Sequence, residues 1–460
     1  CNSDVHMIDR ISSDILQIID KDVATRYEIV PFSSDGAKCI CYGVCGREYA
    51  DILRVLKALR GLEFEVIPLP QEEFNKIFLS HYRTTVNVKV GSADFLNSLI
   101  AEAYQSYCSD IHFECYEARY RIRFRIDGRL IEKYTLEKHQ YISLVNQIKI
   151  MASLDIAEKR LPQDGRIFYK DSSARFDVRV SVMPSIYGEK VVLRLLTRHP
   201  ELLVLDNLGL TRRQLEDYKN AVSRPHGMIL VSGPTGSGKS TTLYATLSML
   251  NDIERNILTV EDPVEYTLDG VNQVQVKEDI GLDFSSALRT FLRQDPDVIM
   301  VGEIRDRETA EIAVRSSLTG HLVLSTLHTN SALGCVSRLS EMGVSPFLQA
   351  ETLNLLVSQR LVRLLCPSCK RQYEHRQGIT LYRKTGCAEC YYTGYKGRKA
   401  IYEVIPVDLT IAESIRQGQI SNLDIHKNGL STLADSALTL LREGRTSLEE
   451  VISFIDKEEL

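Results

Sequence analysis

The sequence has no tryptophan, no long apolar run and no large excess of charge of either sign. Its 56 Lys and Arg residues and 61 Asp and Glu residues give a formal net charge of −5. That balance excludes a strongly basic nucleic-acid coat protein and a highly acidic tail protein. No apolar stretch approaches the ~18 residues that cross a bilayer, and no secretory signal pattern is visible.

The composition is that of folded, soluble domains. Of the 460 residues, 44% are hydrophobic and 25% are charged, which is too apolar for a disordered chain. At the usual ~100–200 residues per domain, the length predicts roughly three domains. The 11 cysteines are less ordinary, because four of them are grouped near the end.

Residues 1–80 are predicted to form a small α+β domain. Isoleucines at helical spacing predict a helix over 8–19. The other elements expected here are strands at 27–29, 40–44 and 64–70 and a helix at 50–59. Cys39, Cys41 and Cys45 are either metal ligands or small buried residues, and the second reading is favoured because no matching Cys or His pair follows.

A polar linker is expected over residues 81–91, followed by a second α+β domain, PAS-like, over 92–200. A helix is expected over 93–106, and residues 120–126 alternate strictly between apolar residues and arginines before an Asp127-Gly128 hairpin turn. More strands are expected around 176–182 and 191–196. The arginine face either contacts nucleic acid or is a solvated or subunit-facing surface, and the acidic overall charge favours the latter.

Residues 201–460 have the pattern of an α/β domain with a parallel sheet. Short apolar runs at 228–231, 257–260, 298–301 and 322–324 alternate with helical stretches. A Cys- and Gly-containing insert over 361–400 interrupts this pattern, and a helical tail follows.

The segment GPTGSGKS at 233–240 fits the phosphate-binding loop G-x-x-x-x-G-K-[ST]. A buried strand before it and a helix after it are the context that this loop requires, because backbone N–H groups and the helix N-terminus then face the phosphates. Lys239 is expected to reach the β- and γ-phosphates, and the Ser240 hydroxyl to bind Mg²⁺. The residues predicted to bind the nucleotide here are Gly233, Pro234, Thr235, Gly236, Ser237, Gly238, Lys239, Ser240 and Thr241.

Two further strands deliver acids to the edge of the sheet where ligands bind. Glu303 follows the run at 298–301, one position later than in the plainest form of such a motif, and Glu261 ends the run at 257–260. Either carboxylate could be the general base, and Glu303 is preferred, with support of the Mg²⁺ shell as its other role. His321 and His328 bracket a third strand, which favours a sensing role over a purely structural one.

These four segments together resemble the secretion and pilus-assembly ATPases, that is, the type II secretion ATPase (general secretion pathway protein E) and the type IV pilus extension ATPase. In that family a Walker A loop, an aspartate box, a Walker B strand and a histidine box follow in this order, here at 233–240, 257–266, 297–306 and 319–329. The resemblance extends upstream to about residue 85. It implies a RecA-like core in a homo-hexameric ATPase that assembles a pilus-like fibre at the cytoplasmic face of a bacterial inner membrane.

The resemblance also implies arginines that neutralise charge on the γ-phosphate. The matching positions are Arg179 and Arg194 in the domain before the core, and Arg289, Arg293, Arg305 and Arg338 within it. Of these, Arg179 and Arg194 are assigned to catalysis with Lys239, Glu303, Glu261 and His328, while Arg289 and Arg293 are assigned to nucleotide binding. Surface ion pairs are the alternative for all six.

Two C-x₂-C pairs, Cys366/Cys369 and Cys387/Cys390, are separated by 17 residues, which is typical of a zinc site. Four thiolates leave no open position, so the zinc is expected to be structural rather than catalytic. Disulfides are the alternative, and the absence of a secretory signal disfavours them. The family's retraction branch typically lacks this insert and an N-terminal domain like 1–80, so both favour the secretion or extension branch.

By resemblance, residues 1–80 dock onto an inner-membrane partner, and the motor also acts on an inner-membrane platform protein. Direct binding of nucleic acid is not expected. Residues 1–80 lack the Arg-Leu-Gly repeats by which some relatives bind a cyclic dinucleotide, and Cys115 stands where the family usually has Pro. The alternatives are a related motor for DNA uptake or conjugation, and a nucleotide-gated scaffold with little turnover.

Overall fold

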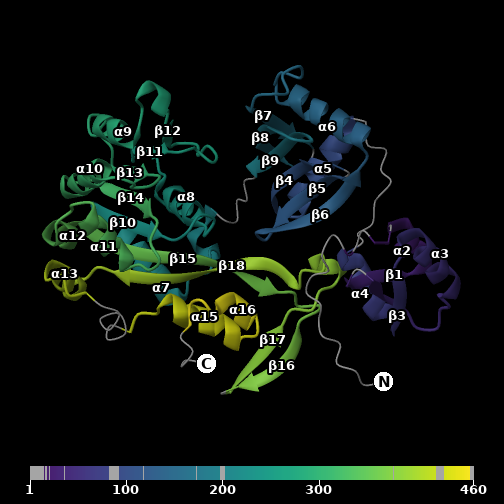
Figure 1. Ribbon diagram of the computed structural model, residues 1–460. Helices are drawn as coiled ribbons and strands as arrows, with labels where there is room; N and C mark the ends of the chain where they lie inside the picture. Colours follow the sequence, from purple (N-terminus) through teal and green to yellow (C-terminus); the bar gives the residue numbers. More distant parts are fainter. Residues whose placement is uncertain are drawn as a thin grey trace. The chain divides into compact units, whose positions relative to one another are not determined.

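The computed structural model describes residues 15, 18–19, 21–35, 37–81, 93–117, 119–171, 174–196, 203–376, 378–420 and 429–455 (Figure 1). The chain divides into two compact units. The first comprises Cys1–Tyr169, Asp177–Leu195 and Thr385–Gly394, and the second comprises Lys170–Phe176, Leu196–Lys384 and Tyr395–Leu460. Most of the helix predicted over 8–19 and all but the first residue of the predicted linker lie outside the described residues.

The first unit contains a three-stranded sheet with helices α2 (Lys21–Tyr27), α3 (Ala50–Arg60) and α4 (Gln71–His81). Its strands are β1 (Ile29–Ser34), β2 (Lys38–Val44) and β3 (Glu63–Leu69), in that order, with β1 antiparallel and β3 parallel to β2. Helix α3 ends at Gly61 with φ 68°, a left-handed conformation that favours glycine, so the helix predicted over 50–59 is confirmed. Cys39 and Cys41 are buried on β2, as packing residues are.

The same unit contains a six-stranded sheet in the order β6-β5-β4-β9-β8-β7, with helices α5 (Ala93–Gln105) and α6 (Lys138–Met151). The strands are β4 (Cys108–Cys115), β5 (Tyr120–Ile126), β6 (Arg129–Leu136), β7 (Gln163–Lys170), β8 (Arg175–Ser185) and β9 (Gly188–Leu196). Asp127 and Gly128 both have positive φ, which is the two-residue hairpin turn that the sequence predicts.

The arginine face of β5 is covered by acidic partners on the neighbouring strand. Glu114 accepts from Arg121 at 2.8 Å and from Arg123 at 2.5 Å, and Arg125 lies 3.5 Å from a carboxylate oxygen of Asp110. These carboxylates offset the positive charge of the face. The reading favoured from sequence, a solvated or subunit-facing surface, stays a prediction.

The second unit is built on a seven-stranded sheet in the order β12-β11-β13-β14-β10-β15-β18 (Figure 1). Its strands are β10 (Gly227–Ser232), β11 (Ile257–Glu261), β12 (Asn272–Gln275), β13 (Val298–Val301), β14 (Leu322–Leu327), β15 (Leu353–Leu365) and β18 (Tyr395–Pro406). The four predicted apolar runs are all strands, and they pair in parallel as expected. Only β18 departs from this, because it pairs antiparallel to β15 at the edge.

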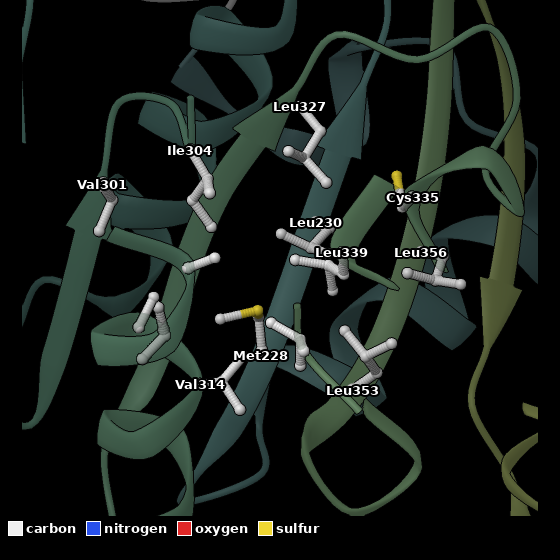
Figure 2. Packing of buried hydrophobic residues seen from close by; sticks show 14 of the residues in the cluster. Met228, Leu230, Val301, Ile304, Val314, Leu327, Cys335, Leu339, Leu353 and Leu356 are labelled. Carbon is white, nitrogen blue, oxygen red and sulfur yellow. The ribbon is translucent and has the colours of Figure 1, made fainter. Parts of the chain in front are cut away.

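Helices cover both faces of this sheet, which explains its continuous apolar runs. Met228 and Leu230 face the larger cluster, shown in Figure 2, together with α9 (Phe284–Phe291), α10 (Arg307–Leu318), α11 (Gly334–Glu341), α12 (Pro346–Thr352) and α13 (Leu409–Arg416). Ile229 and Val231 face the opposite cluster with α7 (Arg212–Val222) and α8 (Lys239–Leu250). Alternate residues of β10 therefore serve two separate apolar layers.

The predicted insert is bounded by strands of the main sheet. β15 continues to Leu365 and β18 begins at Tyr395, so the insert proper is shorter than 361–400. It contains the hairpin β16 (Arg371–Arg376) and β17 (Ile379–Arg383), which packs through Leu381 on α15 (Leu433–Arg442) and α16 (Leu448–Val451). Among all the described helices, none combines the length and the apolar character needed to cross a bilayer.

Candidate functional site

The loop between β10 and α8 has the backbone of a phosphate cradle. Gly233 has φ 150° and Gly238 has φ 93°, values that L side chains rarely adopt. A Cβ on Gly233 would lie 2.6 Å from the backbone carbonyl oxygen of Gln359. A Cβ on Gly238 would lie 2.7 Å from Nε2 of the Gln359 side chain. Glycine is therefore required at both positions by conformation, and at Gly233 also by space, because the atom in contact there belongs to the backbone.

Lys239 and Ser237 bring polar atoms into this cradle. The Nζ of Lys239 donates to the carbonyl oxygens of Gly233 at 2.7 Å and Pro234 at 3.1 Å. Burial lowers the pKa of Lys239, and the nearby charge of Arg360 acts in the same direction. The buried Oγ of Ser237 has no hydrogen-bond partner among the described residues. An amine of this kind and an orphaned hydroxyl in a glycine-lined loop fit a phosphate group.

Glu303 lies two residues beyond the end of β13. It pairs with Nη2 of Arg305, and its Oε2 lies 3.1 Å from Nε2 of His328. Burial acts to raise the pKa of Glu303, but hydrogen bonds and charge from Arg305 and His328 outweigh it, so the pKa lies below its usual value. Its charge also acts on Lys239, which places an anionic carboxylate within electrostatic range of the loop lysine.

Glu261, the other candidate base, is enclosed by donors. Its Oε1 accepts from Thr259 Oγ1 at 2.6 Å and from Gln273 Nε2 at 3.0 Å, and its Oε2 accepts from the hydroxyl of Tyr244. The residue is only 5% exposed. All these contacts hold the carboxylate in one orientation, as a structural acid is held.

The two histidines lie at opposite ends of β14. His328 follows its carboxyl end and contacts Glu303, whereas His321 precedes its amino end and contacts the carbonyl oxygen of Ser316 at 2.9 Å. Six residues of strand separate them, roughly 20 Å. The two histidines therefore lie at opposite ends of the strand that the sequence places between them, and a sensing role for either one stays a prediction.

The four cysteines of the insert come together. Their sulfur atoms all lie within 4.8 Å of one another. The Sγ atoms of Cys387 and Cys390 are 3.8 Å apart, close to the edge of a ZnS₄ tetrahedron with ~2.3 Å bonds. Backbone N–H groups of Cys387 and Gly394 donate to Cys390 Sγ at 3.2 and 3.3 Å, and such donors stabilise metal-bound thiolates. The cluster can hold a zinc ion.

The chain is similar to proteins of known function over most of its length. Residues 91–453 match the family described as Type II/IV secretion system protein. The chain belongs to this family. It is 42% identical to the type IV pilus assembly ATPase PilB of Myxococcus xanthus, covering 96% of this chain and 87% of that protein. It is 50% identical to the type II secretion system protein E of Dickeya dadantii, covering 79% of this chain and 75% of that protein.

Solved structures support the same family. The pilus retraction motor PilT with bound ADP is 27% identical, with a TM-score of 0.56, and the match covers 79% of this chain and 98% of that one. The Legionella pneumophila ATPase DotB shares the fold, with a TM-score of 0.62 at 21% identity over 80% of this chain and 96% of that one.

The core arginines expected from the family mostly have carboxylate partners. Arg289 pairs with Glu308, and Arg338 lies 2.8 Å from Glu341. Arg305 pairs with Glu303, while Arg293 donates to the carbonyl oxygen of Arg289 at 2.9 Å. A nucleotide phosphate would have to compete with the existing carboxylates for three of these four guanidinium groups.

The two upstream arginines lie in the first unit. Arg179 is half-buried on β8, and Arg194 on β9 donates from Nε to Asp110 at 2.8 Å. The side chain of Arg194 is nevertheless 59% exposed. Their contribution to the nucleotide stays a prediction.

Sequence reasoning missed two polar residues beside the loop, Gln359 and Arg360 of β15. Gln359 is buried and accepts from Thr242 Oγ1 at 2.8 Å. Arg360 acts electrostatically on Lys239. The only signal in the sequence is the polar stretch Ser358-Gln359-Arg360 within a mostly apolar strand. It becomes informative only when β15 is known to pair with β10.

Proposed function

We propose that this chain is a motor ATPase that hydrolyses ATP to assemble a pilus or pseudopilus in a type IV pilus or type II secretion system. The observation that carries the proposal is that Lys239, held in its glycine cradle, lies within electrostatic range of the anionic Glu303. The names of the relatives, a pilus assembly ATPase and a secretion system protein E, support the same activity.

The chain's own residues have distinct tasks in this reaction. Loop N–H groups and Lys239 bind the phosphates, and the hydroxyl of Ser240 at the start of α8 holds Mg²⁺ with help from Glu303. When bound, the metal screens the charge of the phosphates. Glu303 orients a water molecule for in-line attack and accepts its proton, and His328 and Arg305 hold the carboxylate in place. Arg179 and Arg194 neutralise charge that develops on the terminal phosphate.

The assembled motor is a homo-hexamer at the cytoplasmic face of the bacterial inner membrane. Residues 1–80 bind an inner-membrane docking protein, and the nucleotide-driven movement acts on an inner-membrane platform protein. The four cysteines hold a structural zinc ion. DNA is not a substrate in this proposal.

The proposal is tested by the rate of phosphate release from ATP by the full chain, assembled as an oligomer. Wild-type protein is expected to turn over ATP, and Lys239→Ala to abolish turnover, because the loop loses its phosphate-binding amine. The exposed Arg212 on α7 supplies a matched control, Arg212→Ala, which should retain full activity. Stimulation by DNA, or binding without turnover in the wild type, would overturn the proposal.

A further inference from the structure

Arg360 lies where β15 runs alongside the start of the phosphate loop. β15 pairs in parallel with β10 as far as Ser358 and Ser232, so Arg360 is two residues past the last pair, next to Gly233. A Cβ placed on Gly233 would come within 3.0 Å of Arg360 Nη1. The guanidinium therefore adjoins the first residue of the loop.

The partners of this guanidinium are all neutral. Nη1 donates to the carbonyl oxygen of Gln359 at 2.9 Å, with Ser358 Oγ at 3.4 Å, and Nη2 donates to the carbonyl oxygen of Asn330 at 2.8 Å. Asn330 lies two residues after His328, so Arg360 connects the phosphate loop to the segment that follows β14. Within the described parts of the chain, no carboxylate oxygen lies at ion-pair distance from Arg360.

The charge of Arg360 is poorly compensated in its surroundings. Burial lowers its pKa, and among the residues that the structure describes the charge of Glu403 acts in the opposite direction. Glu403 is itself buried, and its two oxygens already accept from the backbone N–H groups of Ala332 at 2.8 Å and Leu433 at 3.4 Å. Arg360 and Lys239 are therefore two partly desolvated cations whose charges act on each other, and Glu303 acts as a counter-charge on the lysine. An anion bound between the two cations would relieve their repulsion.

We infer that Arg360 is the residue that recognises the terminal phosphate of a nucleoside triphosphate and makes the site prefer it to a diphosphate. The inference rests on the proposed function, since it requires nucleotide in the loop. Both nucleotides offer a β-phosphate to the loop amides and Lys239, and only the triphosphate adds charge for a second cation. A planar guanidinium can donate several hydrogen bonds to the oxygens of that phosphate. The hydrogen bond from Arg360 to Asn330 also links the phosphate site to the segment that contains His328.

The test is equilibrium binding to the full chain, with Mg²⁺, of fluorescent ADP and of a fluorescent, non-hydrolysable ATP analogue. In Arg360→Gln, which keeps a donor for Asn330 but loses the charge, affinity for the ATP analogue should fall about tenfold or more, the worth of one charge-assisted contact. Affinity for ADP should stay within about twofold. Arg360→Lys keeps the positive charge but not the planar guanidinium, so its affinity for the ATP analogue should fall less than that of Arg360→Gln. Arg212→Ala should bind both nucleotides like wild type.

The outcomes separate this inference from the proposed function. Equal weakening of ADP and the ATP analogue would overturn it, because Arg360 would then only support the loop, and so would unchanged affinity for both. If the melting temperature shows that Arg360→Gln does not fold, Arg360→Lys replaces it, and the same comparison of affinity for the ATP analogue with affinity for ADP decides. Wild-type protein that binds neither nucleotide would instead overturn the proposed function itself.

Discussion

The two candidate bases can be separated by a matched pair of substitutions, Glu303→Gln and Glu261→Gln. Each removes one negative charge and preserves the shape of the side chain. Glu303 is 18% exposed and has two half-exposed partners, Arg305 and His328, whereas Glu261 is enclosed by three donors. If Glu303 is the base, the first substitution affects chemistry and the second mainly affects stability.

The magnitudes follow from these contacts. Loss of a general base lowers kcat by about 10²–10⁴-fold. The ion pair of Glu303 with the half-exposed Arg305 is worth ~0–1 kcal/mol, so Glu303→Gln should leave the melting temperature nearly unchanged. In Glu261→Gln the amide nitrogen cannot accept, so a buried donor loses its partner at a cost of ~1–3 kcal/mol. For a domain of this size, that lowers the melting temperature by roughly 2–12 °C.

Phosphate release and thermal melting of both variants, with wild type as reference, are the measurements. Glu303→Gln should be inactive, stable and still able to bind ADP. Glu261→Gln should be less stable, with turnover within about tenfold of wild type at a temperature where it is folded. The reverse pattern, an active Glu303→Gln and an inactive but fully stable Glu261→Gln, would refute the assignment of the base and the reasoning from hydrogen-bond saturation.

Three other predictions test the remaining parts of the site. Cys387→Ser should lose about one zinc ion per chain and melt at a lower temperature, whereas the exposed Cys45→Ser should do neither; equal zinc content in both would contradict a four-thiolate site. Arg194→Ala should lower ATP turnover without unfolding the protein, and unaltered turnover would make Arg194 a surface residue. Arg305→Gln should move the acid limb of the pH–activity profile to higher pH. The reason is that Arg305 stabilises the ionised form of Glu303 and lowers its pKa, so the wild type loses activity only at a lower pH. An unshifted acid limb would exclude Glu303 as the titrating group.

Local patterns predicted the strands and the loop because the responsible residues are adjacent in sequence. The alternating residues 120–126, the turn at Asp127 and Gly128, and the four apolar runs of the core each specify their own conformation. The zinc cluster was predictable for the same reason, since two short spacings define it. In all of these, the sequence period or spacing is itself the structural constraint.

Long-range contacts were not predictable in this way. The hydrogen bonds of the Glu261 carboxylate come from Tyr244 on a helix and Gln273 on another strand, as well as from Thr259. Arg360 lies beside the phosphate loop only because β15 pairs with β10. Register and pairing decide these points, and neither is contained in local periodicity.

β15 is long enough to connect the phosphate loop with the first cysteine pair along a single strand. The strand runs from the phosphate loop, at Gln359, to Leu365, the residue before Cys366, a span of roughly 20 Å. Its ladder with β18 is regular from Leu355 to Arg363, so the two strands form a continuous hydrogen-bonded ribbon over this stretch. The ladder becomes irregular between Arg363 and Leu365, so this is the point at which the ribbon bends most readily.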